Sequence, residues 1–69
     1  MSYKVTLSIP DISCHHCTAT ISRETKELPG VVAVEGDVAS KTATFTLDNE
    51  LALATVKQTL VEIGYPPAN

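Results

Sequence analysis

The sequence predicts an α+β fold, a ferredoxin-like βαββαβ sandwich in which two helices cover one face of a four-stranded antiparallel sheet. Two observations carry this prediction. Two segments alternate apolar and polar residues as half-buried strands do, and two others repeat apolar residues at helical spacing. The order along the 69 residues is strand, helix, strand, strand, helix and a short last strand. A chain of this length holds one domain, which we place over residues 1–69.

The first part of the chain predicts a strand followed by a helix. Residues 3–9 alternate, and the apolar side chains of one face are Tyr3, Val5, Leu7 and Ile9. A proline and an aspartate at residues 10–11 end this strand. A helix follows over about His16–Leu28, because residues 17, 21 and 28 are apolar at helical spacing and charged residues lie between them. The Pro-Gly pair at residues 29–30 ends the helix.

The middle of the chain predicts a β-hairpin. Residues 31–36 are rich in β-branched side chains and form the second expected strand. Residues 41–47 alternate again, and their inward side chains are Ala43, Phe45 and Leu47. Because the connection between these two segments is short, we expect them to pair as a hairpin.

The last part predicts a second helix and a short edge strand. Asp48 is the expected helix cap, and Glu50 adds negative charge to the first turn. The apolar stripe of this helix consists of Leu53, Val56, Leu60 and Ile63. Gly64 ends the helix. A fourth strand over residues 65–69 would be short, because its two prolines cannot donate hydrogen bonds to a ladder.

Composition and charge exclude several classes of function. Hydrophobic residues make up 43% of the chain and charged residues 19%, as in an ordinary globular domain. A net charge of −3 with five Lys plus Arg argues against nucleic acid as a partner. No apolar run approaches the ~20 residues of a membrane span, and no leader pattern stands at the N-terminus, so we expect a cytoplasmic protein without membrane insertion. The chain is too short for a cofactor domain beside a catalytic one, and we expect a binding protein rather than an enzyme.

The chemistry of the chain is concentrated in one loop, where Cys14 and Cys17 form a C-x-x-C motif before the first helix. Backbone amides and the helix dipole stabilise negative charge at a helix start, so we expect both thiol pKa values to lie below that of a free thiol. Thiolates select soft ions such as Cu(I) and Zn(II). Two thiolates satisfy a linear Cu(I) centre but do not complete a tetrahedral zinc site. We therefore predict a Cu(I) site at Cys14 and Cys17.

His15, His16 and Asp11 leave the ligand set open. One imidazole could complete a three-coordinate ion or serve a second ion or a partner chain; otherwise both histidines are exposed loop residues. Asp11 could raise the thiol pKa values or recruit a harder ion; otherwise it is a solvated turn residue. A Zn(II) or Hg(II) carrier that uses these side chains is therefore an alternative.

Two further interpretations of the cysteine pair remain at this point. C-x-x-C beside a strand-to-helix junction is also the signature of thioredoxin-type proteins, so a small thiol–disulfide oxidoreductase is possible chemistry for Cys14 and Cys17. The two cysteines could instead be small, inert residues of the core. The short chain and the order of its elements differ from those of a thioredoxin, which favours the metal site.

The sequence resembles the heavy-metal-associated domain family, the small copper chaperones and the metal-binding domains of heavy-metal P-type ATPases. The resemblance covers essentially the whole chain and includes "DISCHHC", "LPGVVAV" and "EIGY". The family loop usually reads Gly-Met-Thr/Ser-Cys-x-x-Cys, which Ser13, Cys14 and Cys17 match. Ile12 stands where Met is usual, and Asp11 stands where Gly is usual. Ile12 is an apolar substitute for a Met that packs under the loop in the family.

The resemblance implies a function and a further residue of the site. Tyr65, in the "GY" after the second helix, matches a tyrosine that lies near the metal loop in bacterial-type members, covers the thiolates and tunes metal release; from spacing alone it is equally a core aromatic. The family implies a Cu(I) metallochaperone that passes its ion by thiolate exchange to the metal-binding domain of a heavy-metal P-type ATPase or a similar acceptor. We expect a monomer, with a metal-bridged dimer as the alternative.

Overall fold

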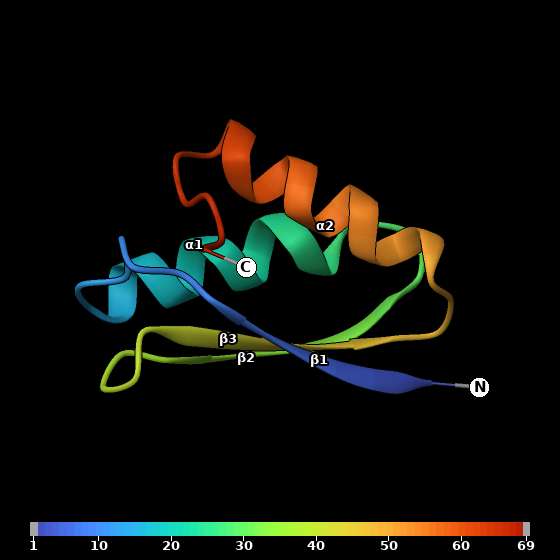
Figure 1. The fold of residues 1–69 in the computed structure, drawn as a ribbon, viewed down its shortest axis with the longest axis horizontal. Coiled ribbons are helices and arrows are strands. Elements are labelled where there is room, and N and C mark those ends of the chain that lie inside the picture. Colours follow the sequence, from blue (N-terminus) through green and yellow to red (C-terminus); the bar gives the residue numbers. More distant parts are fainter. Residues whose placement is uncertain (1, 69) are drawn as a thin grey trace.

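The computed structural model describes residues 2–68, which form three strands and two helices in two layers (Figure 1). The strands are β1 (Tyr3–Ser8), β2 (Val31–Asp37) and β3 (Thr42–Leu47), and the helices are α1 (His15–Lys26) and α2 (Leu51–Glu62). Both helices lie on the same face of the sheet. Neither helix in this part of the chain is long and apolar enough to cross a membrane. The ferredoxin-like arrangement of two helices on one antiparallel sheet is therefore confirmed.

The sheet has the strand order β1-β3-β2, and both neighbouring pairs are antiparallel. Phe45 of the central strand pairs with Val5 on one side and with Val34 on the other. The register of β2 skips Val32, which marks a β-bulge and leaves this side chain 54% exposed. The bulge shifts the alternation by one residue, so Val31 and Val34 both pack against the core.

The structure corrects one part of the predicted fold, because residues 65–68 form no fourth strand. This segment still runs beside β1, where the Ala68 N–H donates to the Ser8 carbonyl at 2.7 Å. Pro66 and Pro67 have no N–H, so they cannot extend this single bond into a ladder. Within the described residues the sheet has three strands, and residue 69 of the predicted strand lies outside them.

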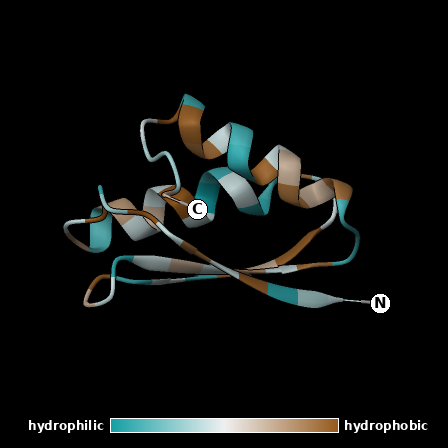
Figure 2. Cartoon of the chain, in the orientation of Figure 1, coloured by the Kyte–Doolittle hydropathy of each residue, from teal (hydrophilic) through white to brown (hydrophobic). Residues whose placement is uncertain are grey.

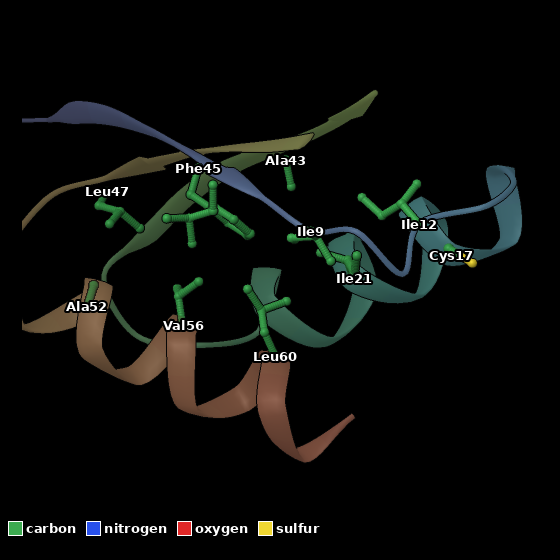
Figure 3. Packing of buried hydrophobic residues seen from close by; sticks show 11 residues of the cluster. Ile9, Ile12, Cys17, Ile21, Ala43, Phe45, Leu47, Ala52, Val56 and Leu60 are labelled. Carbon is green, nitrogen blue, oxygen red and sulfur yellow. The ribbon is translucent and has the colours of Figure 1, made fainter. Parts of the chain in front are cut away.

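The hydrophobic core fills the space between the sheet and the helices. Figure 2 shows hydrophobic and hydrophilic bands interleaved along both helices, as expected where one face is buried and the other solvated. The buried hydrophobic residues are Leu7, Ile9, Ile12, Cys17, Ile21, Ala43, Phe45, Leu47, Ala52, Val56 and Leu60. Figure 3 shows this cluster extending from Leu47 and Ala52 at one end to Ile12 and Cys17 at the other. The inward faces predicted for the alternating segments and for the second helix belong to this core or pack against it.

The ends of the helices differ slightly from the predicted ones. α1 begins one residue earlier than expected and ends two residues earlier, which is within the usual uncertainty of helix ends. The predicted cap of α2, Asp48, is wrong. The Asn49 side-chain oxygen accepts the Ala52 N–H at 3.0 Å, while Asp48 accepts a hydrogen bond from the Asn49 side-chain amide at 3.1 Å. The Asn49 side chain therefore satisfies this helical N–H, while Glu50 occupies the N-cap position without a capping hydrogen bond from its side chain.

Candidate metal centre

The loop between β1 and α1 is fixed to the core by its apolar residues. The Ile9 N–H donates to the Lys41 carbonyl at 2.8 Å, which extends the pairing of β1 with β3 by one residue beyond the end of β1. The chain then turns, and the Ile12 N–H donates to the Ile9 carbonyl at 3.1 Å. The Ile12 side chain is fully buried, as expected for an apolar residue under the loop. This anchor presents the residues that follow at one end of the sandwich (Figure 1).

The two cysteines of the loop have different environments. Cys14 is exposed and occupies the N-cap position of α1, with extended backbone and no capping hydrogen bond from its side chain. Cys17 lies in the first turn of the helix, is 8% exposed and belongs to the buried cluster. Its N–H donates to the Cys14 carbonyl at 3.0 Å, which closes the turn that carries both residues. Both thiols are free. One thiol is thus at the surface and the other at the edge of the core.

His15, His16 and Asp11 all lie exposed around this loop. The two histidines are the first residues of α1, and the His15 carbonyl accepts a hydrogen bond from the Thr18 hydroxyl at 3.0 Å. Among residues 2–68, no three side chains of His, Cys, Asp or Glu are grouped as a metal site. The geometry therefore brings together neither histidine nor Asp11 with both thiols.

The Cys17 thiol is surrounded by hydrogen-bond donors that favour its ionised form. The pKa of Cys17 is lowered from 9.0 to about 6, mainly because the Tyr65 hydroxyl hydrogen-bonds to the sulfur. Ser13 adds its backbone N–H and its hydroxyl, whose oxygen lies 3.6 Å from Sγ, and the Cys14 backbone contributes least. Burial opposes these effects but does not outweigh them. A thiol that ionises below neutral pH is a good soft-metal ligand and a good nucleophile.

Tyr65 reaches this sulfur because of the way α2 ends. Gly64 has φ of +90°, and its N–H donates to the Val61 carbonyl at 3.2 Å. The Tyr65 N–H donates to the Leu60 carbonyl at 2.8 Å, which completes a Schellman motif. This reversal returns the tail over the start of α1 (Figure 1). The pKa of Tyr65 is raised, first by its hydrogen bond to Cys17, then by burial and by negative charge on Cys17, Cys14 and Asp11.

Sequence reasoning expected the pKa of Cys17 to fall but attributed the effect to the opening amides of the helix. The principal donor instead comes from a tyrosine 48 positions away, and the others from the loop residues before the helix. Ser13 was identified only as a match to the family motif, and its part in the site was missed. Ser13 precedes the N-cap of α1, so helical spacing gave no signal for its contact with Cys17.

The fold and the thiol loop at its strand-to-helix junction are those of a small α+β domain with a candidate soft-metal site, and comparisons with known proteins identify the family. The profile of the heavy-metal-associated domain matches residues 6–66. The chain therefore belongs to the heavy-metal-associated domain family. This confirms the resemblance on which the expected heavy-metal binding was based.

Individual relatives agree with this assignment. A COP-associated protein of Helicobacter pylori strain J99 is 30% identical over 61 residues, which span 88% of this chain and 92% of the relative. The yeast copper transporter domain CCC2A, solved in apo and Cu(I)-loaded states, is 25% identical with a TM-score of 0.84, covering 93% of this chain and 89% of that domain. Oxidized MerP from Ralstonia metallidurans CH34 shares the fold, with a TM-score of 0.86, 23% identity and coverage of 99% and 96%.

Proposed function

We propose that this protein is a Cu(I) metallochaperone that holds the ion between the Cys14 and Cys17 thiolates. The observation that carries the proposal is the pairing of one surface thiol with one low-pKa thiol at the edge of the core. Two thiolates satisfy a linear Cu(I) ion, and low coordination leaves room for an incoming ligand. The similarity to a yeast copper transporter domain supports the choice of ion.

The different exposure of the two sulfurs supports transfer by ligand exchange. Cys14 is reachable by a thiolate of an acceptor, whereas Cys17 is buried at the edge of the core and contacts the Ser13 hydroxyl. The acceptor we propose is the metal-binding domain of a heavy-metal P-type ATPase, for which a copper-transporter domain of the same fold is the precedent. The carrier is proposed to act as a monomer in the cytoplasm, where reducing conditions keep both thiols free.

A competition titration against a Cu(I)-specific chelator tests the proposal. We expect the parent protein to withdraw Cu(I) from the chelator at one ion per chain. The variant with Cys14→Ser and Cys17→Ala should lose this binding, while variants with His15→Ala or His16→Ala should keep it. If the cysteine variant competes as well as the parent, the assigned ligands are wrong. Gel filtration of the loaded protein at rising concentration separates a monomer from a metal-bridged dimer.

The identity of the ion is tested by metal analysis of protein purified under reducing conditions, with X-ray absorption at the edge of the bound metal. Two sulfur neighbours and no nitrogen or oxygen are expected for Cu(I). A Zn(II) or Hg(II) ion with His15, His16 or Asp11 in its first shell of neighbours would replace the Cu(I) proposal by the alternative carrier. Such a result would keep the two cysteines as ligands and change the cargo.

The low pKa of Cys17 also favours one competing function, a thiol–disulfide oxidoreductase, because the thiolate is the attacking species in disulfide exchange. That function predicts turnover of an external disulfide in the presence of a thiol reductant. We expect no turnover above the rate of the Cys14→Ser, Cys17→Ala variant. Turnover that depends on both cysteines would establish the oxidoreductase.

A further inference from the structure

The inner face of the sheet carries two small residues, Gly36 and Ala43, where it meets the first turn of α1. Gly36 of β2 pairs with Ala43 of β3, and Ala43 in turn pairs with Leu7 of β1. α1 packs on β2, and its first turn lies at this end of the sheet (Figure 1). Because the side chains of Gly36 and Ala43 are small, the start of α1 can approach the backbone of β2 closely at this pair.

Gly36 is required by this close approach rather than by its backbone conformation. Gly30 and Gly64 are the glycines with positive φ in the described chain, whereas Gly36 is not among them. A Cβ at Gly36 would lie 2.6 Å from both Cβ and Cγ2 of Thr18 and 3.4 Å from its Cα. Carbon atoms in contact prefer about 3.5–4.0 Å, so the new methyl group would require a displacement of about 0.9 Å.

The displaced turn is the one that carries the Cys17 sulfur. Thr18 follows Cys17 directly, and its hydroxyl ties it to the His15 carbonyl at 3.0 Å, so the turn moves as a unit. The contact between Cys17 Sγ and Ser13 Oγ is already 3.6 Å long. A shift of α1 away from β2 by a large fraction of an ångström would open this contact and expose the sulfur. The burial of the Cys17 sulfur thus depends on the distance between the first turn of α1 and β2.

We propose that Gly36 is a positioning residue for the thiol site, which seats the first turn of α1 on β2 and thereby sets how deeply Cys17 is buried. The residue touches neither thiol and acts through Thr18. The effect on metal binding rests on the function proposed above, whereas the effect on the exposure of Cys17 does not.

The test compares Gly36→Ala with Gly30→Ala, a matched substitution at the other end of the sheet. Gly30 has φ of +90°, and a Cβ there would lie 2.8 Å from the Ala52 Cβ, so this control is strained and crowded as well. Both are made with Cys14→Ser, so that Cys17 is the only thiol. The readout is the ratio of alkylation rates with a bulky and a small reagent at one pH, because the ionised fraction of the thiol cancels in that ratio.

We expect the bulky-to-small ratio to rise severalfold in Gly36→Ala and to stay at the parent value in Gly30→Ala. Thr18→Ser removes Cγ2 and keeps the hydroxyl, so in the Gly36→Ala background it should recover part of the change, and alone it should change nothing. If Gly36→Ala does not fold, the double variant Gly36→Ala, Thr18→Ser is compared with the parent instead. Its ratio of bulky to small alkylation rates should still exceed that of the parent. Equal ratios in the two glycine variants, or no recovery by Thr18→Ser, would overturn the proposal.

Cu(I) affinity is measured on the same glycine variants with both cysteines present. A severalfold weakening is expected in Gly36→Ala alone. If the parent itself binds no Cu(I), the proposed function fails while the exposure result stands. If the parent binds Cu(I) and Gly36→Ala binds it equally while the ratio has changed, the depth of Cys17 does not control affinity, and the metal part of the inference is refuted.

Discussion

Tyr65→Phe isolates the contribution of one hydroxyl to the ionisation of Cys17. The aromatic ring is half-buried and packs against the core, and phenylalanine retains it while removing the donor. The hydroxyl is the largest of four interactions that together lower the pKa of the thiol from 9.0 to about 6. Because burial acts in the opposite direction, these four interactions together outweigh it, and the Tyr65 hydroxyl is the largest of them. We therefore expect the pKa of Cys17 to rise from about 6 toward 9.0 in the variant.

The assay is the pH dependence of alkylation of apo-protein that carries Cys14→Ser, so that a single thiol reacts. The quantity to compare is the midpoint of the rate profile and not the rate at one pH. A thiolate of higher pKa is intrinsically more nucleophilic, with a Brønsted coefficient of about 0.4–0.5, so a smaller ionised fraction and a faster intrinsic reaction partly cancel. The midpoint reports ionisation alone.

Tyr3→Phe is the control for this measurement. The Tyr3 hydroxyl donates to the Asn49 carbonyl at 3.2 Å, at the end of the sheet away from the thiols. Its loss removes a phenol hydrogen bond without touching Cys17, so the midpoint should stay at the parent value. An unchanged midpoint in Tyr65→Phe, or the same shift in Tyr3→Phe, would refute the view that the Tyr65 hydroxyl holds the thiol ionised.

Ile12→Ala should lower the free energy of unfolding by about 2–5 kcal/mol in a urea titration, because Ile12 is fully buried beneath the loop; a loss below about 1 kcal/mol would mean that the loop is anchored elsewhere. The free energy of unfolding of the apo-protein should rise as the pH rises from about 6 to 9.0, since the unfolded Cys17 thiol still binds its proton in this window and the folded one does not. Cys17→Ala should remove this rise, and its persistence would assign it to another group. Gly64→Ala should cost about 1–2 kcal/mol in thermal unfolding from its positive φ alone, because nothing lies within 4 Å of the new Cβ; an unchanged transition would show that the tail reverses in another way.

The elements that the sequence predicted well are those whose cause is local. Alternation over residues 3–9 and 41–47 defines one buried face of each strand, and that face is the core in the structure. The fourth strand failed for a competing local reason, because the two prolines after Tyr65 cannot donate and, within residues 2–68, only the Ala68 N–H bonds to the edge of β1. The cap of α2 failed because Asp48 and Asn49 are both good capping residues, and only the turn geometry decides which side chain reaches the Ala52 N–H.

The sequence motif predicted which two thiols belong to the candidate site, but not how exposed each thiol is or which groups surround it. C-x-x-C marks two thiols whatever surrounds them, but the surface position of Cys14 and the burial of Cys17 follow from where the helix begins relative to the sheet. The effect of Tyr65 on the pKa of Cys17 depends on the Schellman reversal at Gly64, which brings together residues 48 positions apart. No periodicity within either segment encodes that contact, so the resemblance to a family was the only signal for it in the sequence.

The Cys17 sulfur packs in the hydrophobic core and is also one of the two proposed metal ligands. A substitution of Cys17 therefore affects stability as well as metal binding. The residue is 8% exposed and lies in the buried cluster beside Ile12 and Ile21. Cys17→Ser places a hydroxyl where an apolar sulfur packed, whereas Cys17→Ala removes the ligand and keeps the apolar contact. We expect both variants to lose Cu(I) binding, and Cys17→Ser to be the less stable of the two in urea. If Cys17→Ser is at least as stable as Cys17→Ala, the hydroxyl is satisfied by Ser13 and Tyr65, and the sulfur is held at this site by its polar neighbours more than by the core.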